Sequence, residues 1–440
     1  MNQAGLQLEQ APPLSVPFRF FLVAPVFLLL AAAALLWRGP EALAARLSPA
    51  AIAIAHLFAL GFMVMVMIGA MMQMLPVLQG SPVPKPHATA AVTHAGVGLG
   101  TLALAAGFLF GERWLLKAGV LALAAGFLAF VAAVLVCLGR APSRNHTVRT
   151  MGLALLSLLV TVVFGVMLAM LYGWGIAPPN NSAHSLHPGW SLLGWTGLLL
   201  VGVGFELVPM LQMTPLYPKP MARYLSVVIL ALLVLWSAAL WIDDGHWGAF
   251  AVACAVAMAV AYMLFAVMTV VLQQRRRRRL PDVTLDFWRV GMGSLIGASL
   301  AWGMRVALPN SLSDPWPESM DILIGVLAMF GFAGSVISGM LYKIMPFLAW
   351  FHLQSVCGPG TLAPNMKKIL PDARQRLQFR SQILALVLLC AAALWPRLFV
   401  YPAALALAAT AVLLEMNMLI VVRAYRDNLK QMRARAASKS

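Results

Sequence analysis

The sequences LPVLQGSPVPKP at residues 75–86 and VPMLQMTPLYPKP at residues 208–220 share the pattern P-x-L-Q-x-[ST]-P and both end in Pro-Lys-Pro. A weaker third copy, GMLYKIMPFLAW at residues 339–350, keeps one glycine and one proline of the pattern. In all three copies the glycine precedes the proline by seven residues: Gly69 and Pro76, Gly202 and Pro209, Gly339 and Pro346. The three prolines are 133 and 137 residues apart, so the sequence predicts three copies of one structural unit.

The composition is typical of a membrane protein. Of the 440 residues, 62% are hydrophobic and only 10% are charged. Apolar runs of about 20 residues, the length that crosses a bilayer, recur along the whole chain. The net charge of +17 would suit nucleic acid if the basic residues formed one soluble face, but they lie between the apolar runs. The composition therefore excludes an ordinary soluble enzyme and favours the lipid bilayer, not nucleic acid, as the partner.

The apolar runs predict an all-α polytopic membrane protein with twelve transmembrane helices, because a single segment in lipid must satisfy its own backbone hydrogen bonds. Twelve helices divide into three four-helix units, each with the repeated sequence at the end of its second helix. We expect three four-helix arcs around a pseudo-threefold axis. The predicted spans are 17–37, 50–78, 88–110, 114–138, 150–174, 186–212, 222–242, 247–272, 286–308, 320–348, 378–396 and 399–423. The predicted regions are a tail at 1–16, units at 17–138, 150–272 and 286–424, and a basic tail at 425–440.

Lys and Arg gather in alternate loops, which predicts the orientation of the chain. The largest groups are Arg275–Arg279, Lys367 with Lys368, and the basic tail. By the positive-inside rule they lie in the cytoplasm, so we expect both termini on the cytoplasmic side of a bacterial inner membrane. Arg275–Arg279 could bind anionic lipid headgroups. The simpler interpretation, which we favour, is a stop-transfer anchor at a solvated helix end.

Three histidines fall at the same face of the predicted bundle. Ser48 and Pro49 predict a helix start, which places His56 about 10 Å inside the membrane. His187 opens the sixth span from that face, with His184 one turn earlier. An ionisable residue within a membrane is a functional candidate. The alternative is a neutral histidine that hydrogen-bonds to a neighbouring helix.

Methionines follow His56 along the same helix. Met63 and Met67 lie on its face, 7 and 11 residues further on. Thioethers beside an imidazole could bind Cu(I) or line the flat face of a macrocycle. Methionine also fills gaps between helices, so simple packing is the alternative interpretation.

Three polar residues share one register of the repeat. Gln73, Glu206 and Lys343 each lie three residues before a repeat proline, towards the cytoplasmic end of a span. If the units surround a pseudo-threefold axis, Glu206 and Lys343 could pair, which would lower the cost of charge in lipid. Otherwise each side chain extends separately to the nearby interface.

The segment from His56 through GAMMQMLPVLQG resembles the second helix of subunit I of heme-copper oxidases and nitric oxide reductases. His187-Pro188 resembles the His-Pro of their sixth helix. The resemblance implies twelve helices in three arcs, with His56 as an axial ligand of a low-spin heme and His187 as a copper ligand. The NnrS-type membrane heme proteins are a similar diverged group, although their WHxHE-like run is absent here.

Departures from the family limit what the resemblance implies. The spans at 222–242 and 320–348 contain no histidine, where the family has a copper-binding pair and two heme ligands. Three imidazoles for copper cannot be assembled, so a standard oxygen-reducing centre is excluded. What remains is one b-type heme on His56, with a second ligand such as Met320, or no cofactor.

Three functions stay open at this point. The first is a divergent oxidase-like protein that holds a b-type heme for redox chemistry or for handling NO or O2, and is therefore not a complete oxidase. The second is a membrane transporter, with Cu(I) as the cargo that the methionines suggest, since internal repeats also occur in carriers. The third is a scaffold or assembly factor that binds respiratory-chain subunits and has no cofactor.

Overall fold

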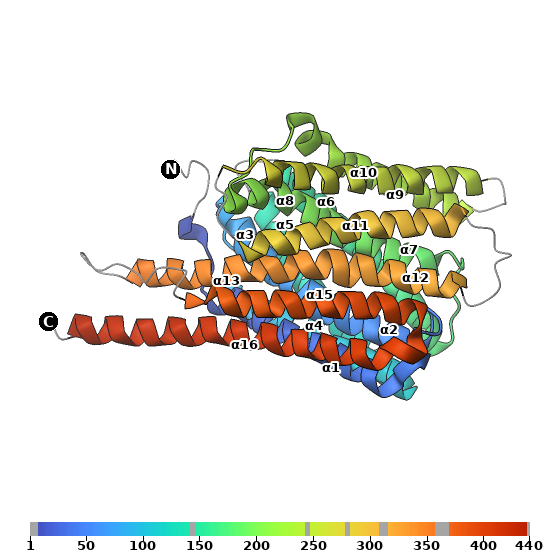
Figure 1. Ribbon diagram of the computed structural model, residues 1–440, viewed down its shortest axis with the longest axis horizontal. Helices are drawn as coiled ribbons and strands as arrows, with labels where there is room; N and C mark the ends of the chain where they lie inside the picture. Colours follow the sequence, from blue (N-terminus) through green and yellow to red (C-terminus); the bar gives the residue numbers. More distant parts are fainter. Residues whose placement is uncertain are drawn as a thin grey trace.

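The computed structural model describes residues 8–140, 146–242, 247–277, 282–307, 316–356 and 369–437. Within these ranges the chain is helical, with no β-strand, and its long helices lie side by side (Figure 1). This confirms the predicted all-α, multi-pass membrane architecture. The helices are α1 (Ser15–Arg38), α2 (Pro49–His56), α3 (Met65–Gln79), α4 (Pro86–Phe110), α5 (Arg113–Gly139), α6 (His146–Trp174), α7 (Ala183–Gly189), α8 (Leu198–Gln212), α9 (Lys219–Ile242), α10 (Gly248–Gln274), α11 (Val283–Ala307), α12 (Trp316–Val326), α13 (Ser335–Val356), α15 (Asp372–Leu394) and α16 (Pro396–Ala437).

Three π-helices join pairs of these helices into continuous rods. They are η3 (Leu57–Val64) between α2 and α3, η4 (Trp190–Gly197) between α7 and α8, and η5 (Leu327–Gly334) between α12 and α13. Their first residues are 133 and 137 residues apart, which is the spacing of the repeat prolines. The π-segment η5 contacts both η3 and η4, so the three rods meet at the centre of the bundle.

Eleven helices of the described chain are long and apolar enough to cross a membrane. The predicted span 286–308 corresponds to α11, which is not among the eleven because Asp286, Arg289 and Arg305 make it more polar. It still runs the length of the bundle beside α10 and α13 (Figure 1). The first and last described helices begin and end at one end of the bundle, which requires an even number of crossings (Figure 1). We therefore count α11 as the twelfth.

The ends of the repeat-bearing helices follow from local chemistry. Ser48 Oγ accepts a hydrogen bond from the Ala51 amide at 3.1 Å and Pro49 is the first residue of α2, as predicted. Gly80 ends α3 in the left-handed conformation, with φ of 69°, which glycine adopts without strain. Met213 ends α8 at the equivalent position with φ of 55°. The two copies therefore share a backbone turn as well as a sequence.

The repeat glycines are points of close helix contact. A Cβ on Gly69 would lie 2.9 Å from Phe20 of α1, and one on Gly202 would lie 2.7 Å from Thr150 of α6. A Cβ on Gly339 would lie 2.6 Å from Phe287 of α11. In each case the glycine lets one rod approach the long helix that precedes it in the chain.

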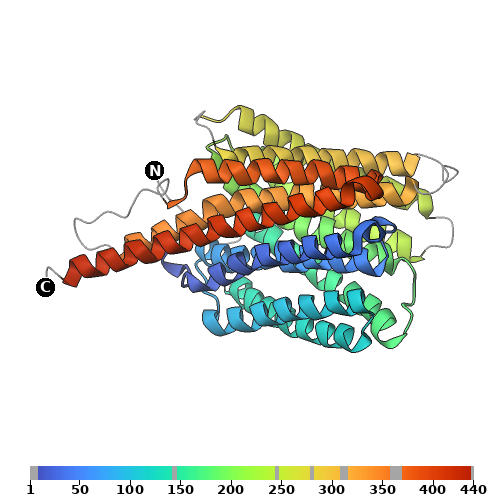
Figure 2. The same cartoon turned by 60° about the horizontal axis from the view of Figure 1, so that its bottom comes forward.

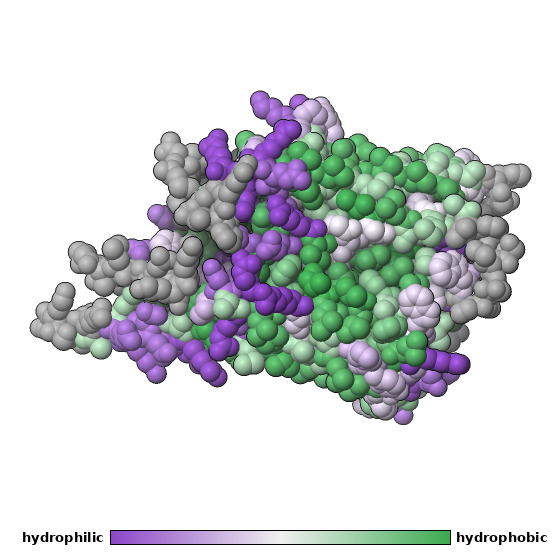
Figure 3. Space-filling view, in the orientation of Figure 1, coloured by the Kyte–Doolittle hydropathy of each residue, from purple (hydrophilic) through white to green (hydrophobic). Residues whose placement is uncertain are grey.

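Polar side chains gather at one end of the molecule. Figure 3 shows most hydrophilic residues at the end where α16 leaves the bundle, hydrophobic residues over much of the middle of the visible face, and a smaller hydrophilic group at the opposite end. Helix α16 has 42 residues, about 63 Å at 1.5 Å per residue, so it extends beyond its neighbours (Figure 2). The predicted basic groups at Arg278, Arg279, Lys367 and Lys368 lie outside the described residues.

Candidate functional site

His56 is the last residue of α2 and directly precedes the π-segment η3. Its Nδ1 lies 2.7 Å from the backbone carbonyl oxygen of Ile52, one turn earlier. A carbonyl oxygen can only accept, so Nδ1 carries the hydrogen and Nε2 keeps its lone pair. The local helix therefore fixes both the tautomer and the direction of this ring.

His187 is held in the same way, but by another helix. Its Nδ1 lies 3.1 Å from the backbone carbonyl oxygen of Thr161 in α6. The ring rests on Gly165, where an added Cβ would lie 3.0 Å from Cε1. A glycine one turn beyond Thr161 thus makes room for the imidazole on the surface of α6.

The two histidines lie beside one another. Their ring centroids are 6.0 Å apart and their planes differ by 15°. Within the described residues, neither Nε2 has a hydrogen-bond partner. Histidines that bind a metal through one nitrogen commonly donate the other N–H to a backbone carbonyl, which is the arrangement of both rings here.

Aromatic side chains from two further helices complete the surroundings of His56. The ring of Phe108 in α4 lies 6.4 Å from His56, and its plane is within 22° of the imidazole. Tyr172 in α6 packs against Phe108 at 5.1 Å, close to edge-on. Phe108 is therefore an aromatic neighbour of His56, and Tyr172 packs against Phe108 in turn.

The donor set decides which metal groups fit. The described residues contain no group of three or more His, Cys, Asp or Glu side chains that could hold a metal ion. Bare Zn²⁺ or Cu²⁺ normally takes at least three protein ligands. A porphyrin supplies four ligands to its iron, so two imidazoles complete its coordination. The pair of His56 and His187 therefore fits heme iron, or Cu(I) with two ligands.

The other predicted ligands lie apart from this pair. His184 is one turn before His187, and within the described residues its ring makes no hydrogen bond or ring contact. Met63 and Met67 are 1% and 3% exposed, and they follow His56 along the rod by 7 and 11 residues. Met320 is buried in α12, which packs mainly against α11, α15 and η5. The neighbour of His56 is His187, so the expected pairing with Met320 gains no support.

The predicted polar register needs one correction. Lys343 Nζ lies 2.8 Å from Asp282 Oδ2, so its ion pair is with Asp282 and not with Glu206. Asp282 directly precedes α11, the helix on which Gly339 packs, and is therefore within reach of Lys343. Gln73 is buried with its Oε1 unpaired, and Glu206 forms no ion pair within the described part of the chain.

Several residues of the site were not identified in the sequence. Gly165 and Thr161 act through backbone geometry, which leaves no distinctive pattern. A detectable signal did exist in the π-segments, where Gly-Phe or Gly-Trp recurs at the repeat spacing: Gly61 and Phe62, Gly194 and Trp195, Gly331 and Phe332.

Comparison with known proteins identifies no family. No protein-family model matches the chain, and no curated protein matches it in sequence.

Proposed function

We propose that this membrane protein binds one b-type heme between His56 and His187 and uses it for one-electron redox chemistry. The observation that supports this most strongly is the pair itself. Two histidines, 131 positions apart in the chain, have parallel rings 6.0 Å apart, and each donates Nδ1–H to a carbonyl. Two imidazoles whose Nε2 atoms have no hydrogen-bond partner among the described residues could hold heme iron between them.

We further propose that the helices form three four-helix units arranged as arcs in a ring. Equivalent contacts support this arrangement: α5 packs on α6, α10 on α11, and α16 on α1, which joins the last helix of each unit to the first of the next. Figure 2 shows α16 beside α1. The equal spacing of η3, η4 and η5 is the second line of support.

We also propose that the chain is a divergent relative of subunit I of heme-copper oxidases, without the copper centre. Helix α9 and segments α12 and η5 contain no histidine. His352 lies near the far end of α13, where its Nδ1 bonds to the Leu348 carbonyl. Helix α9 therefore offers no imidazole where the family has its copper-binding pair.

The roles of the chain's own residues follow from the geometry. Ile52 and Thr161 orient the two imidazoles through their backbone carbonyl groups. Gly165 has no side chain, so the His187 ring can lie against α6 at that position. Phe108 packs beside His56, and Tyr172 packs against Phe108. A bound heme would supply one-electron redox chemistry.

Copper handling is the second candidate. Two imidazoles also suit Cu(I), and the buried Met63 and Met67 continue along the same rod as His56. This candidate predicts bound copper and no Soret band. The protein would be colourless, because Cu(I) has a filled d shell.

The test is an absorption spectrum of the purified full chain, oxidised and then reduced with dithionite. We expect a Soret band in the wild type, its loss in His56→Ala and His187→Ala, and its retention in the control His184→Ala. Equal Soret bands in all four proteins would reject the assigned ligands. A colourless protein that retains one copper ion per chain would favour the second candidate.

A further inference from the structure

The basic ends of α6 and α9 form a corner with three cations. Lys219 is the first residue of α9 and Arg223 lies one turn later, so both are on one face of that helix. Arg149 is in the first turn of α6, and its Nη2 donates a hydrogen bond to the backbone carbonyl oxygen of Arg223. Within the described residues none of the three forms an ion pair. Residues 141–145, just before α6, include no acid.

Buried contacts hold this corner in a fixed geometry. Thr150 Oγ1 donates a hydrogen bond to Ser226 Oγ at 2.9 Å, and both side chains are fully buried between α6 and α9. Burial raises the pKa of Tyr217, in the loop before α9, and its neutral hydroxyl shares a 2.8 Å hydrogen bond with Thr269 of α10. The cations are therefore presented by a rigid frame.

The corner has unsatisfied capacity for an anion. Arg149 Nε is buried and has no hydrogen-bond partner. Both α6 and α9 begin here, so the positive ends of two helix dipoles add to the three charges. Three cations, two helix N-termini and no acid together attract an anionic group.

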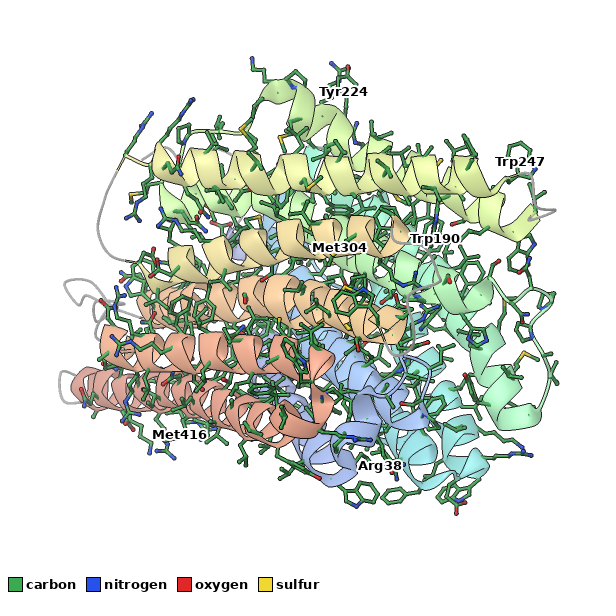
Figure 4. All side chains as sticks on the ribbon, turned by 45° about the vertical axis from the view of Figure 1, so that its right-hand side comes forward. Arg38, Trp190, Tyr224, Trp247, Met304 and Met416 are labelled. Atoms are coloured by element: carbon green, nitrogen blue, oxygen red, sulfur yellow. The ribbon has the colours of Figure 1, made fainter. Side chains whose placement is uncertain are left out.

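The outer face of α9 next to the cations is apolar and exposed. Tyr224 is 53% exposed, and Val227 and Val228 are 42% and 46% exposed on the following turn. The guanidinium of Arg223 lies 5.2 Å from the ring centroid of Tyr224, which lies at the outside of the bundle (Figure 4). Tyrosine is enriched at the interface between lipid and water, so the cations are at the level of the headgroups.

We propose that this corner binds the phosphate headgroup of an anionic membrane phospholipid, with Arg149, Lys219 and Arg223 as its ligands. Guanidinium groups form charge-assisted hydrogen bonds to phosphate oxygens, often two at a time. The acyl chains lie along Val227 and Val228. Inorganic phosphate would use the cations alone, whereas a lipid uses both the cations and the apolar face.

Native mass spectrometry of the full chain in detergent tests the proposal, with phosphatidylglycerol and phosphatidylcholine as probes. The wild type should retain one phosphatidylglycerol molecule and release phosphatidylcholine. In Arg149→Gln and Arg223→Gln the retention should fall about tenfold, the loss expected for one charge-assisted contact. Arg426→Gln, which removes one exposed cation from the same end of the bundle, should leave it unchanged.

Three results would overturn the proposal. The first is an equal loss of lipid in the control and the corner variants, which would mean that only total charge matters. The second is equal retention of the two lipids by the wild type. The third is displacement of phosphatidylglycerol by millimolar inorganic phosphate, which would make this a site for a soluble anion. If the two arginine variants are less stable than the wild type, Lys219→Gln provides the same test, because Lys219 lies at an exposed helix start. Retention of phosphatidylglycerol should fall in this variant too.

Discussion

His56 and His187 each donate one ring N–H to a backbone carbonyl oxygen, and the other ring nitrogen has no hydrogen-bond partner among the described residues. The two carbonyls belong to different helices, so α6 has to keep its place for the pair to form. Gly165 is the most sensitive point, because the His187 ring occupies the space where a side chain would lie. The site therefore depends on one backbone position as much as on its two imidazoles.

Gly165→Ala should weaken heme binding about tenfold, since its Cβ would lie 3.0 Å from His187 Cε1 and push the ring away from Thr161. The measurement is a heme titration of the protein prepared without heme. Gly152→Ala on the same helix is the control, because its Cβ meets nothing closer than 4.0 Å. Unchanged heme affinity in Gly165→Ala would show that the His187 ring can move aside without cost, which would contradict the packing argument.

Single residues were predictable where local chemistry decides them. Ser48 and Pro49 predict the start of α2, and the expected position of His56 inside the membrane follows from its distance along the helix from that start. The pairing of His56 with His187 was not predictable in the same way. It depends on which faces of the second and sixth rods meet, and that is decided by tertiary contacts such as Thr161 with His187.

At the scale of elements, each rod combines a π-segment with close glycine contacts. A Cβ on Gly61 would lie 2.2 Å from Phe27, and one on Gly194 or Gly331 would lie within 2.8 Å of a serine on the preceding long helix. A π-helix is rare and often marks a functional position. Here each one places a glycine against the neighbouring helix near the centre of the bundle.

Gly202→Ala should lower the free energy of unfolding by about 1–3 kcal/mol, because its Cβ would lie 2.7 Å from Thr150 and overpack the contact between α8 and α6. Gly303→Ala in α11 meets nothing within 4 Å and should stabilise by up to about 1 kcal/mol through helix propensity. Reversible unfolding in mixed detergent measures both changes. Effects of the same sign in the two variants would contradict the packing argument.

Element boundaries followed well from apolar runs and prolines, but two features did not. In the π-segments the hydrogen bonds run from residue i to i+5, which adds a residue to the turn. The pattern of apolar residues does not predict where this happens. Helix α11 is long enough to cross the membrane, yet three charged residues reduce its apolar character. Its Asp286 lies 3.8 Å from Arg376, so part of that charge is paired between helices.

At the scale of the whole molecule, the crossing by α11 decides the topology. If α11 crosses, residues on its two sides lie at opposite membrane faces. Cysteines introduced at Arg277 and at Trp316 of a cysteine-free protein should then react with an impermeant thiol reagent from opposite sides. Labelling of both from one side would mean that α11 does not cross, and would contradict the even number of crossings inferred from the two ends of the chain.

The position of the termini leads to a related expectation. The described chain begins and ends at the end of the bundle where hydrophilic residues gather (Figures 1 and 3). The basic last part of α16 lies at this end, so by the positive-inside rule we expect this end to face the cytoplasm. Alkaline phosphatase fused to the C-terminus should be inactive and a fluorescent protein should be bright. The opposite pair of results would reverse the orientation while leaving the fold intact.

The central claim is that a ligand joins His56 to His187, and an experimental density map of the purified protein tests it most directly. We predict a flat density with a strong central peak between the two rings, in contact with Nε2 of each. Imidazoles that hydrogen-bond to each other or to a water molecule, with no density of that kind between them, would contradict the account.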